Sequence, residues 1–234
     1  MISAVALLFA AGSAVAQDAM TTSTDGGIKA TSGDVTLEAN VNLLSGDVTL
    51  NNALNQIKGR YFLSDNVAFR LGANITLDSR TQRTTVATPG GTGEMETKQN
   101  HFGLSIMPGI EKHFAGTNRL SPYIGAELGI AIDSRNQETT TPGVAGTDEW
   151  KGSWGAGGTR GNTQIALNAL AGFDFYVAQH LFLGYEMGFG LGIRTDSEVE
   201  HTDAANVTTV EDGKDSNFFI SPLVRNGIRV GFVF

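Results

Sequence analysis

The chain of 234 residues contains no cysteine, only five prolines, and 16 lysine and arginine residues against 24 aspartate and glutamate residues. The lack of cysteine excludes disulfides, which fits an exported protein that does without them. The formal net charge is -8, and no lysine and arginine cluster could follow a phosphate backbone. We therefore do not expect nucleic acid as a partner.

Long apolar runs are also missing. A transmembrane helix needs about 20 consecutive apolar residues, and no stretch approaches that length, which excludes a helical inner-membrane protein. The first residues, MISAVALLFAAGSAVA, hold a short apolar run that ends in Ala14-Val15-Ala16. Small residues in this pattern are typical of a signal-peptidase site. Residues 1–16 are therefore predicted to be a signal peptide that directs export.

A hydrophobic period of two is the strongest pattern present. From Leu181 to Ile193 every odd position is apolar, while the even positions are glycine apart from Phe182 and Glu186. Successive side chains of a strand point to opposite faces, so this segment carries one continuous apolar face. Strands of soluble sandwiches run for about 5 to 6 residues, whereas a tilted strand that crosses a bilayer needs about 9 to 11. The length favours a membrane-crossing strand.

Similar alternation recurs along the chain, more weakly in the first two segments. The predicted strands are approximately 35–43, 55–63, 67–77, 102–111, 122–132, 164–177, 181–193 and 227–234. An even number of strands allows an antiparallel barrel to close, and closure leaves no unpaired backbone edge in lipid. The sequence thus predicts an all-β fold, an eight-stranded antiparallel transmembrane β-barrel over residues 34–234. Residues 17–33 are expected to form a flexible periplasmic segment.

Connection lengths alternate as they do in such barrels. The connections near 64–66, 115–121 and 179–180 are short and are predicted to be periplasmic turns. Those near 45–54, 79–100, 133–162 and 195–217 are long and are predicted to be extracellular loops. Aromatic residues cluster near the predicted periplasmic ends, where an interfacial girdle is expected. They are Tyr61, Phe62, Phe114, Tyr123, Tyr176, Phe182, Phe232 and Phe234.

With these features, residues 34–234 resemble the small outer-membrane β-barrel proteins of the outer-membrane protein A and X type. The segment GRYFLSDNVAFRLG, residues 59–72, is similar to a hairpin of many such barrels from the Bacteroidetes. The resemblance implies surroundings of outer-membrane lipid and lipopolysaccharide. It also implies that the last strand is a recognition signal for the barrel-assembly machinery, carried by Ile228, Val230, Phe232 and Phe234. No peptidoglycan-binding domain is expected after the barrel, so the resemblance does not imply cell-wall anchoring.

Charged residues occupy the inward face of the predicted strands. The lumen of an eight-stranded barrel is only wide enough for side chains. Unpaired charges there would be strongly destabilising, so we expect a salt-bridge network and a structural or surface-adhesive role. The alternative is a narrow gated pore for ions or small solutes, in which Arg60 or Arg70 exchanges carboxylate partners. The inward set is Glu38, Lys58, Arg60, Arg70, Glu127, Asp174, Glu186 and Arg229.

A catalytic site is not expected. His101 and Ser105 share an inward face, yet no acid is placed by spacing to orient the imidazole. His113 and His180 fall near predicted periplasmic turns. A lipid-modifying outer-membrane enzyme therefore remains only a third alternative, and we predict no enzymatic activity, cofactor or metal centre.

The long loops are where an extracellular ligand is expected to bind. The acidic loop 195–217 could attract basic partners or divalent cations that bridge lipopolysaccharide phosphates, but it lacks the regular spacing of a calcium loop. A solvated surface loop is the simpler interpretation. In loop 133–162, Trp150, Trp154 and the glycine-rich residues 155–158 are interpreted either as a flexible contact tip or as interfacial anchors.

Overall fold

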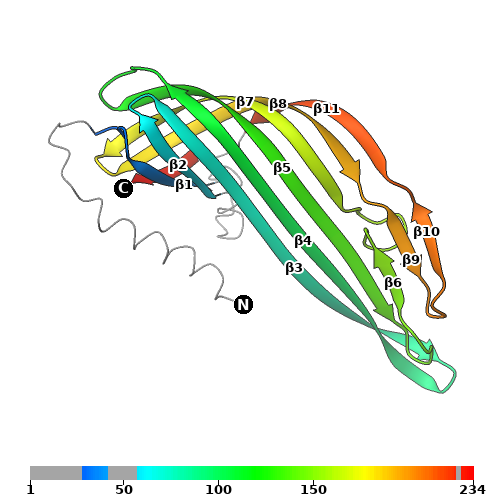
Figure 1. Ribbon diagram of the computed structural model, residues 1–234. Helices are drawn as coiled ribbons and strands as arrows, with labels where there is room; N and C mark the ends of the chain where they lie inside the picture. Colours follow the sequence, from blue (N-terminus) through cyan, green and yellow to red (C-terminus); the bar gives the residue numbers. More distant parts are fainter. Residues whose placement is uncertain (1–27, 42–56, 225–227) are drawn as a thin grey trace.

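The computed structural model describes residues 28–41, 57–224 and 228–234. These ranges form one antiparallel sheet of twelve strands, and none of their residues builds a helix long and apolar enough to cross a membrane (Figure 1). The strands are β1 (Val35–Val41), β2 (Ile57–Ser64), β3 (Val67–Thr88), β4 (Gly91–His113), β5 (Leu120–Thr140), β6 (Asp148–Lys151), β7 (Asn162–Ala178), β8 (Leu181–Asp196), β9 (Val199–Thr202), β10 (Thr208–Asp212), β11 (Asp215–Val224) and β12 (Ile228–Val233).

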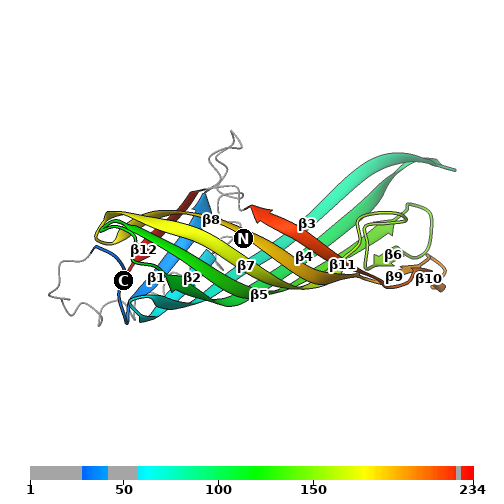
Figure 2. The ribbon, with the colours of Figure 1, turned by 90° about the horizontal axis from the view of Figure 1, so that it is seen from above.

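Eight strands close into a ring, which confirms the predicted barrel (Figure 2). Neighbours pair in the order β1, β2, β3, β4, β5, β7, β8 and β12, and β12 pairs again with β1. Along β8, residues 181–184 pair with β12 and residues 187–196 pair with β11. Both segments therefore lie beside β8, at the same place in the ring.

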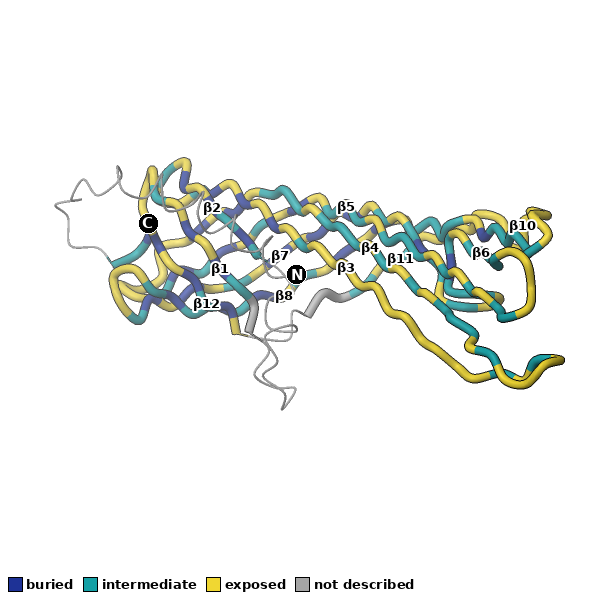
Figure 3. The backbone as a smooth tube through the Cα atoms, turned by 90° about the horizontal axis from the view of Figure 1, so that it is seen from below, coloured by how far each residue is buried: buried dark blue, intermediate teal, exposed yellow. Residues whose placement is uncertain are grey.

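Side chains alternate between the outside and the inside of the barrel, as the period of two predicted. Outward residues such as Ile75, Leu128 and Leu191 are 65%, 42% and 45% exposed and form an apolar belt, as a lipid-facing surface requires. Buried inward residues are concentrated in the half of the barrel that holds the short turns (Figure 3). These short turns lie between β2 and β3, β4 and β5, and β7 and β8, which agrees with the prediction.

One predicted loop is wrong. Residues 79–100 continue β3 and β4 as a paired hairpin that turns at Pro89 and Gly90. Beyond the belt both faces of the hairpin are polar, so the hydrophobic alternation ends although the strands do not. Cross-strand pairs support it there: Arg83 Nε donates to Glu96 Oε2 at 2.8 Å, and this hydrogen bond lowers the pKa of the Glu96 carboxyl from its ordinary value.

The other two described long connections also contain strands. β5 extends to Thr140, and β6, β9 and β10 add to it in turn, so an extracellular sheet continues the barrel wall outward. Figure 1 shows this sheet at the end of the barrel opposite the chain's C-terminus. The predicted signal peptide and the predicted loop 45–54 lie outside the described residues.

Candidate functional site

The candidate site is the polar interior of the barrel. All eight inward charges named from the sequence are at most 3% exposed. Glycines on facing positions leave room for their long side chains. A Cβ atom at Gly184 would lie 2.6 Å from Arg229 Nη2 and 2.8 Å from Asp174 Oδ1. Side chains rather than an open channel therefore fill this level of the lumen.

Arg70 is the centre of one half of the network. Its guanidinium lies 2.7 Å from Glu111, 3.0 Å from Glu127 and 2.8 Å from Glu186. Lys58 Nζ lies 3.1 Å from Glu186 and 2.6 Å from Glu38, and it thereby joins this half to the next. Each carboxylate thus faces a cation at hydrogen-bond distance, as buried charges require.

Arg60 and Arg229 organise the other half. Arg60 lies 2.6 Å from Glu38 and 3.3 Å from Glu111, and it also pairs with Asp174. Arg229 lies 2.7 Å from Glu38 and 3.0 Å from Asp174. Because Glu38 and Glu111 are shared between the halves, the buried charges form one connected network across all eight strands of the ring.

Sequence reasoning missed part of this network. Glu111 has the same strand parity as the inward residues His101 and Ser105 but is missing from the predicted set of charges. With it, the interior holds five acids against four bases. Neutral donors offset the excess: Tyr123 Oη donates to Glu186 at 2.6 Å, and Asn168 Nδ2 donates to Glu127 at 3.1 Å. His113 is buried here too, with Nε2 3.2 Å from Glu111, because β4 continues two residues beyond its predicted end.

Aromatic side chains pack together beneath the network and are called the aromatic floor. Phe62, Tyr176 and Phe182 are at most 2% exposed and pack with Ala68 and Val233. Their assignment to an outward girdle is therefore wrong, as it is for Tyr123, because strand parity turns all four inward. Phe114, Phe232 and Phe234 do lie on the exposed surface, as predicted.

The segment before β1 completes this floor. Ala30 is 5% exposed within the apolar cluster, and Ile28 packs against it. Lys29 Nζ donates to the carbonyl of Ala115 at 2.7 Å, and the Gly33 amide donates to the carbonyl of Phe62 at 2.8 Å. The part of segment 17–33 that the structure describes thus lies across the end of the barrel.

The outer mouth carries a separate polar cluster. His101 Nε2 lies 2.7 Å from Asp133 Oδ2, and Arg135 Nε donates to the other oxygen of the same carboxylate at 2.6 Å. The acid that sequence spacing did not supply therefore comes from β5. No hydrogen bond links His101 to Ser105 in the described part of the chain, and no three histidine, aspartate or glutamate residues there are grouped to hold a metal ion.

Both tryptophans pack within the extracellular sheet. Trp150 stacks on His201 with ring centroids 4.1 Å apart. Trp154 Nε1 donates to the carbonyl of Asn100 at 3.1 Å, and the Arg135 guanidinium lies 4.5 Å from its ring centroid. The interpretation as a flexible contact tip is therefore wrong for these two rings. Trp154 packs the connection between β5 and β7 against β4 and β5, and Trp150 packs it against β9.

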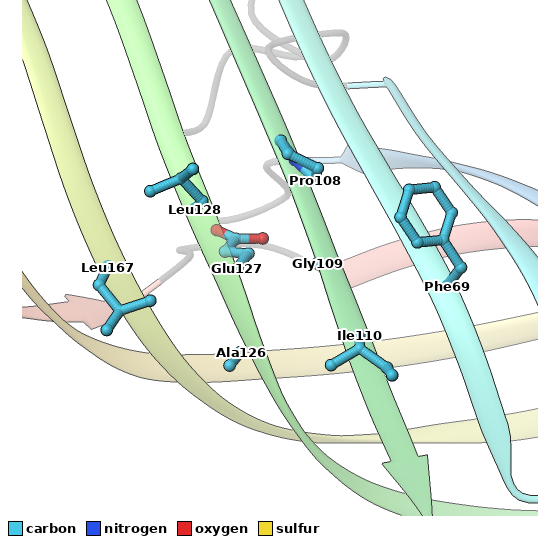
Figure 4. Close-up of a pocket in the computed structure, with 8 residues that line it drawn as sticks. All are labelled: Phe69, Pro108, Gly109, Ile110, Ala126, Glu127, Leu128 and Leu167. Atoms are coloured by element: carbon cyan, nitrogen blue, oxygen red, sulfur yellow. The ribbon is translucent and has the colours of Figure 1, made fainter.

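A shallow hollow of about 390 Å³ lies on the outer wall (Figure 4). It occurs where the pairing of β4 with β5 skips Met107 and Pro108, since proline has no amide hydrogen to donate. Its lining is almost wholly apolar, and Glu127 behind it is only 2% exposed. The hollow is therefore a dent in the lipid-facing belt and does not open into the lumen. Its lining residues are Phe69, Pro108, Gly109, Ile110, Ala126, Glu127, Leu128 and Leu167.

Comparison with known proteins gives one family match. The Putative OmpA-OmpF-like porin family matches residues 44–230. Two similar solved structures are barrels from Pseudomonas aeruginosa. The N-terminal β-barrel domain of OprF is 15% identical, with a TM-score of 0.38 over 88% of this chain and 100% of that chain. The outer membrane protein OprG is 10% identical, with a TM-score of 0.41 over 89% and 99%. No curated protein matches the chain.

Proposed function

The chain belongs to the Putative OmpA-OmpF-like porin family and is a protein of the bacterial outer membrane, and we propose that it acts as a closed barrel with a structural and adhesive role. The observation that carries this proposal is the buried charge network with its aromatic floor. Both lie across the lumen, and the charged residues named from the sequence are at most 3% exposed. A solute would have to separate paired charges and then displace packed rings.

The adhesive part of the proposal rests on the extracellular strands. In the described connections, a hairpin and a sheet project beyond the belt in place of irregular loops. Ordered strands present a defined surface and lose little conformational entropy on binding. The barrel would then serve as the membrane anchor for this surface, with lipid and lipopolysaccharide around the belt. Ile228, Phe232 and Phe234, exposed on the belt face of the last strand, suit a signal read by the assembly machinery before the barrel closes.

Planar-bilayer recording tests closure. We expect the purified wild-type barrel to insert without discrete openings, and Arg70→Met and Glu186→Gln to remain closed because the floor is untouched. Glu138→Gln, on the extracellular sheet, is the matched control. Discrete wild-type openings that change with Arg70→Met or Glu186→Gln, but not with Glu138→Gln, would overturn the closed barrel.

That outcome would favour a narrow gated pore, the second candidate. One observation supports it: Arg70 already touches three carboxylates, and Glu186 is shared with Lys58. Partners could be exchanged without leaving a charge unpaired. A lipid-modifying enzyme has less support: Asp133 lies beside His101, but it also binds Arg135, and no hydrogen bond links His101 to Ser105 among the described residues. We propose no enzymatic activity, and His101→Ala should leave lipid turnover unchanged.

A further inference from the structure

Two extracellular turns, one between β5 and β6 and one between β9 and β10, meet beside the β3–β4 hairpin and are uncharged throughout. They are residues 141–147, Thr-Pro-Gly-Val-Ala-Gly-Thr, and residues 204–207, Ala-Ala-Asn-Val, and together they are called the apex. They lie in direct contact: a Cβ atom at Gly146 would come 2.1 Å from the carbonyl oxygen of Ala204. The apex is therefore one surface made of two segments that are about 60 residues apart in the chain.

The apex is held in a defined conformation. Asp203 Oδ1 accepts hydrogen bonds from the amides of Ala205 and Val207, both at 2.9 Å. The Val144 amide donates to the carbonyl of Thr141 at 3.2 Å, and Gly146 adopts φ +113°, which favours glycine. A surface fixed in this way is preorganised for binding.

The apex exposes apolar side chains to water. Val144 is 50% exposed and Val207 is 56% exposed, and Ala145 and Ala205 beside them are exposed too. The turns that carry them adjoin β6, β9 and β10, at the end of the sheet far from the short turns, so the lipid-facing belt does not account for them (Figure 1). Apolar groups gathered on a polar surface mark sites of interaction.

Acidic residues border the apex. Asp148, Glu149 and Asp203 flank the apex with no lysine or arginine between them and it, and Glu200, Glu211 and Asp212 lie farther along β9 and β10, where Lys151 pairs in register with Glu200. We propose that the apex is a docking surface for a protein whose contact face holds a small apolar pocket bordered by lysine and arginine. This inference rests on the proposed adhesive function and names the chemistry of its partner.

Charge and composition favour this occupant over two others. A second copy would bring the same acidic border against itself, and like charges repel. A lipid surface would be held by aromatic anchors and basic residues, but the apex has neither, and Trp150 is stacked on His201. A positively charged protein face meets both features at once. The contact is small, so adhesion would depend on many copies acting together.

The test uses the full-length barrel in nanodiscs of zwitterionic lipid and two designed helical bundles. Both bundles carry the same leucine-lined pocket, bordered by lysine in one and by glutamate in the other. We expect the lysine-bordered bundle to bind and the glutamate-bordered one not to bind. Val144→Ser with Val207→Ser should weaken binding about tenfold. Asp148→Asn with Glu149→Gln should weaken it less and flatten its salt dependence.

Val210→Ser is the matched control, because Val210 is 60% exposed on β10 but lies outside the apex. Equal binding of the two bundles, no binding of either, or an equal loss with Val210→Ser would overturn the proposal. So would zwitterionic or anionic vesicles bound through the two valines, or self-association that Val144→Ser with Val207→Ser abolishes. Planar-bilayer recording tests closure of the barrel separately. A barrel that shows no openings and whose apex binds neither bundle would contradict the docking proposal but not the closed barrel.

Discussion

At the scale of single residues, burial decides what an arginine contributes. Arg70 is 0% exposed and faces three carboxylates, whereas the side chain of Arg83 is 62% exposed beside Glu94 and Glu96. Removing one partner of a buried ion pair costs about 3–5 kcal/mol, because the remaining charge is left uncompensated. An exposed pair contributes about 0–1 kcal/mol, because water and salt screen it. The same kind of ion pair therefore contributes much to the free energy of unfolding inside the lumen and little on the hairpin.

We expect Arg70→Met to lower the free energy of unfolding by about 3–5 kcal/mol, as measured by urea titration of the barrel in phospholipid vesicles. Arg83→Met is the matched control and should leave it almost unchanged, because water and salt screen this exposed ion pair. Arg70→Lys should fall between wild type and Arg70→Met, since an ammonium keeps the charge but cannot reach three carboxylates in fixed geometry. Equal effects of the two methionine variants would contradict a stabilising network.

At the scale of one strand, the free-energy cost of a charged residue depends on which face of the strand it occupies and on its depth in the membrane. Leu128 lies midway along the outward apolar positions of β5, which run from Ile124 to Ile132, and Ser134 follows on the same face. Leu128→Arg should destabilise the barrel by about 2–4 kcal/mol, and Ser134→Arg by about 0–1 kcal/mol, because an arginine near the interface reaches water. Urea titration in vesicles measures both. Similar costs for the two variants would show that the belt does not face lipid.

The same strand-scale pattern explains what the sequence could predict. Alternation exists because lipid selects every second residue, so it located the strands and faces within the belt. It could not locate the outer halves of β3 and β4, where water surrounds both faces and only pairings such as Arg83 with Glu96 remain. His113 was missed for a related reason, since the apolar pattern ends before the strand does.

Sequence reasoning could not predict which side chains of different strands contact one another. Parity placed Glu111 inward, but only the ring brings it within 3.3 Å of Arg60 on β2. Asp133 meets His101 because β4 and β5 run side by side, a relation that spacing within one strand does not contain. The apex likewise depends on two turns that come together only in the folded sheet.

At the scale of the whole molecule, closure of the first strand onto the last makes the sheet a barrel. The register of β1 with β12 sets Ala39 opposite Val230 and Val41 opposite Ile228. Directly opposed residues have Cα atoms about 4.5–5.5 Å apart, within disulfide range, whereas diagonal neighbours lie about 7–8 Å apart. The chain has no cysteine, so an introduced pair has no competing partner.

Ala39→Cys with Val230→Cys should therefore form a disulfide on mild oxidation of the folded barrel. Boiled but unreduced protein should then migrate differently from the same sample after reduction, because the crosslink keeps the unfolded chain closed on itself. Ala39→Cys with Ile228→Cys is the control, and it should crosslink much less because its pair is diagonal. Equal crosslinking of the two pairs would contradict this register, and no crosslinking of either would contradict closure of the ring through β1 and β12.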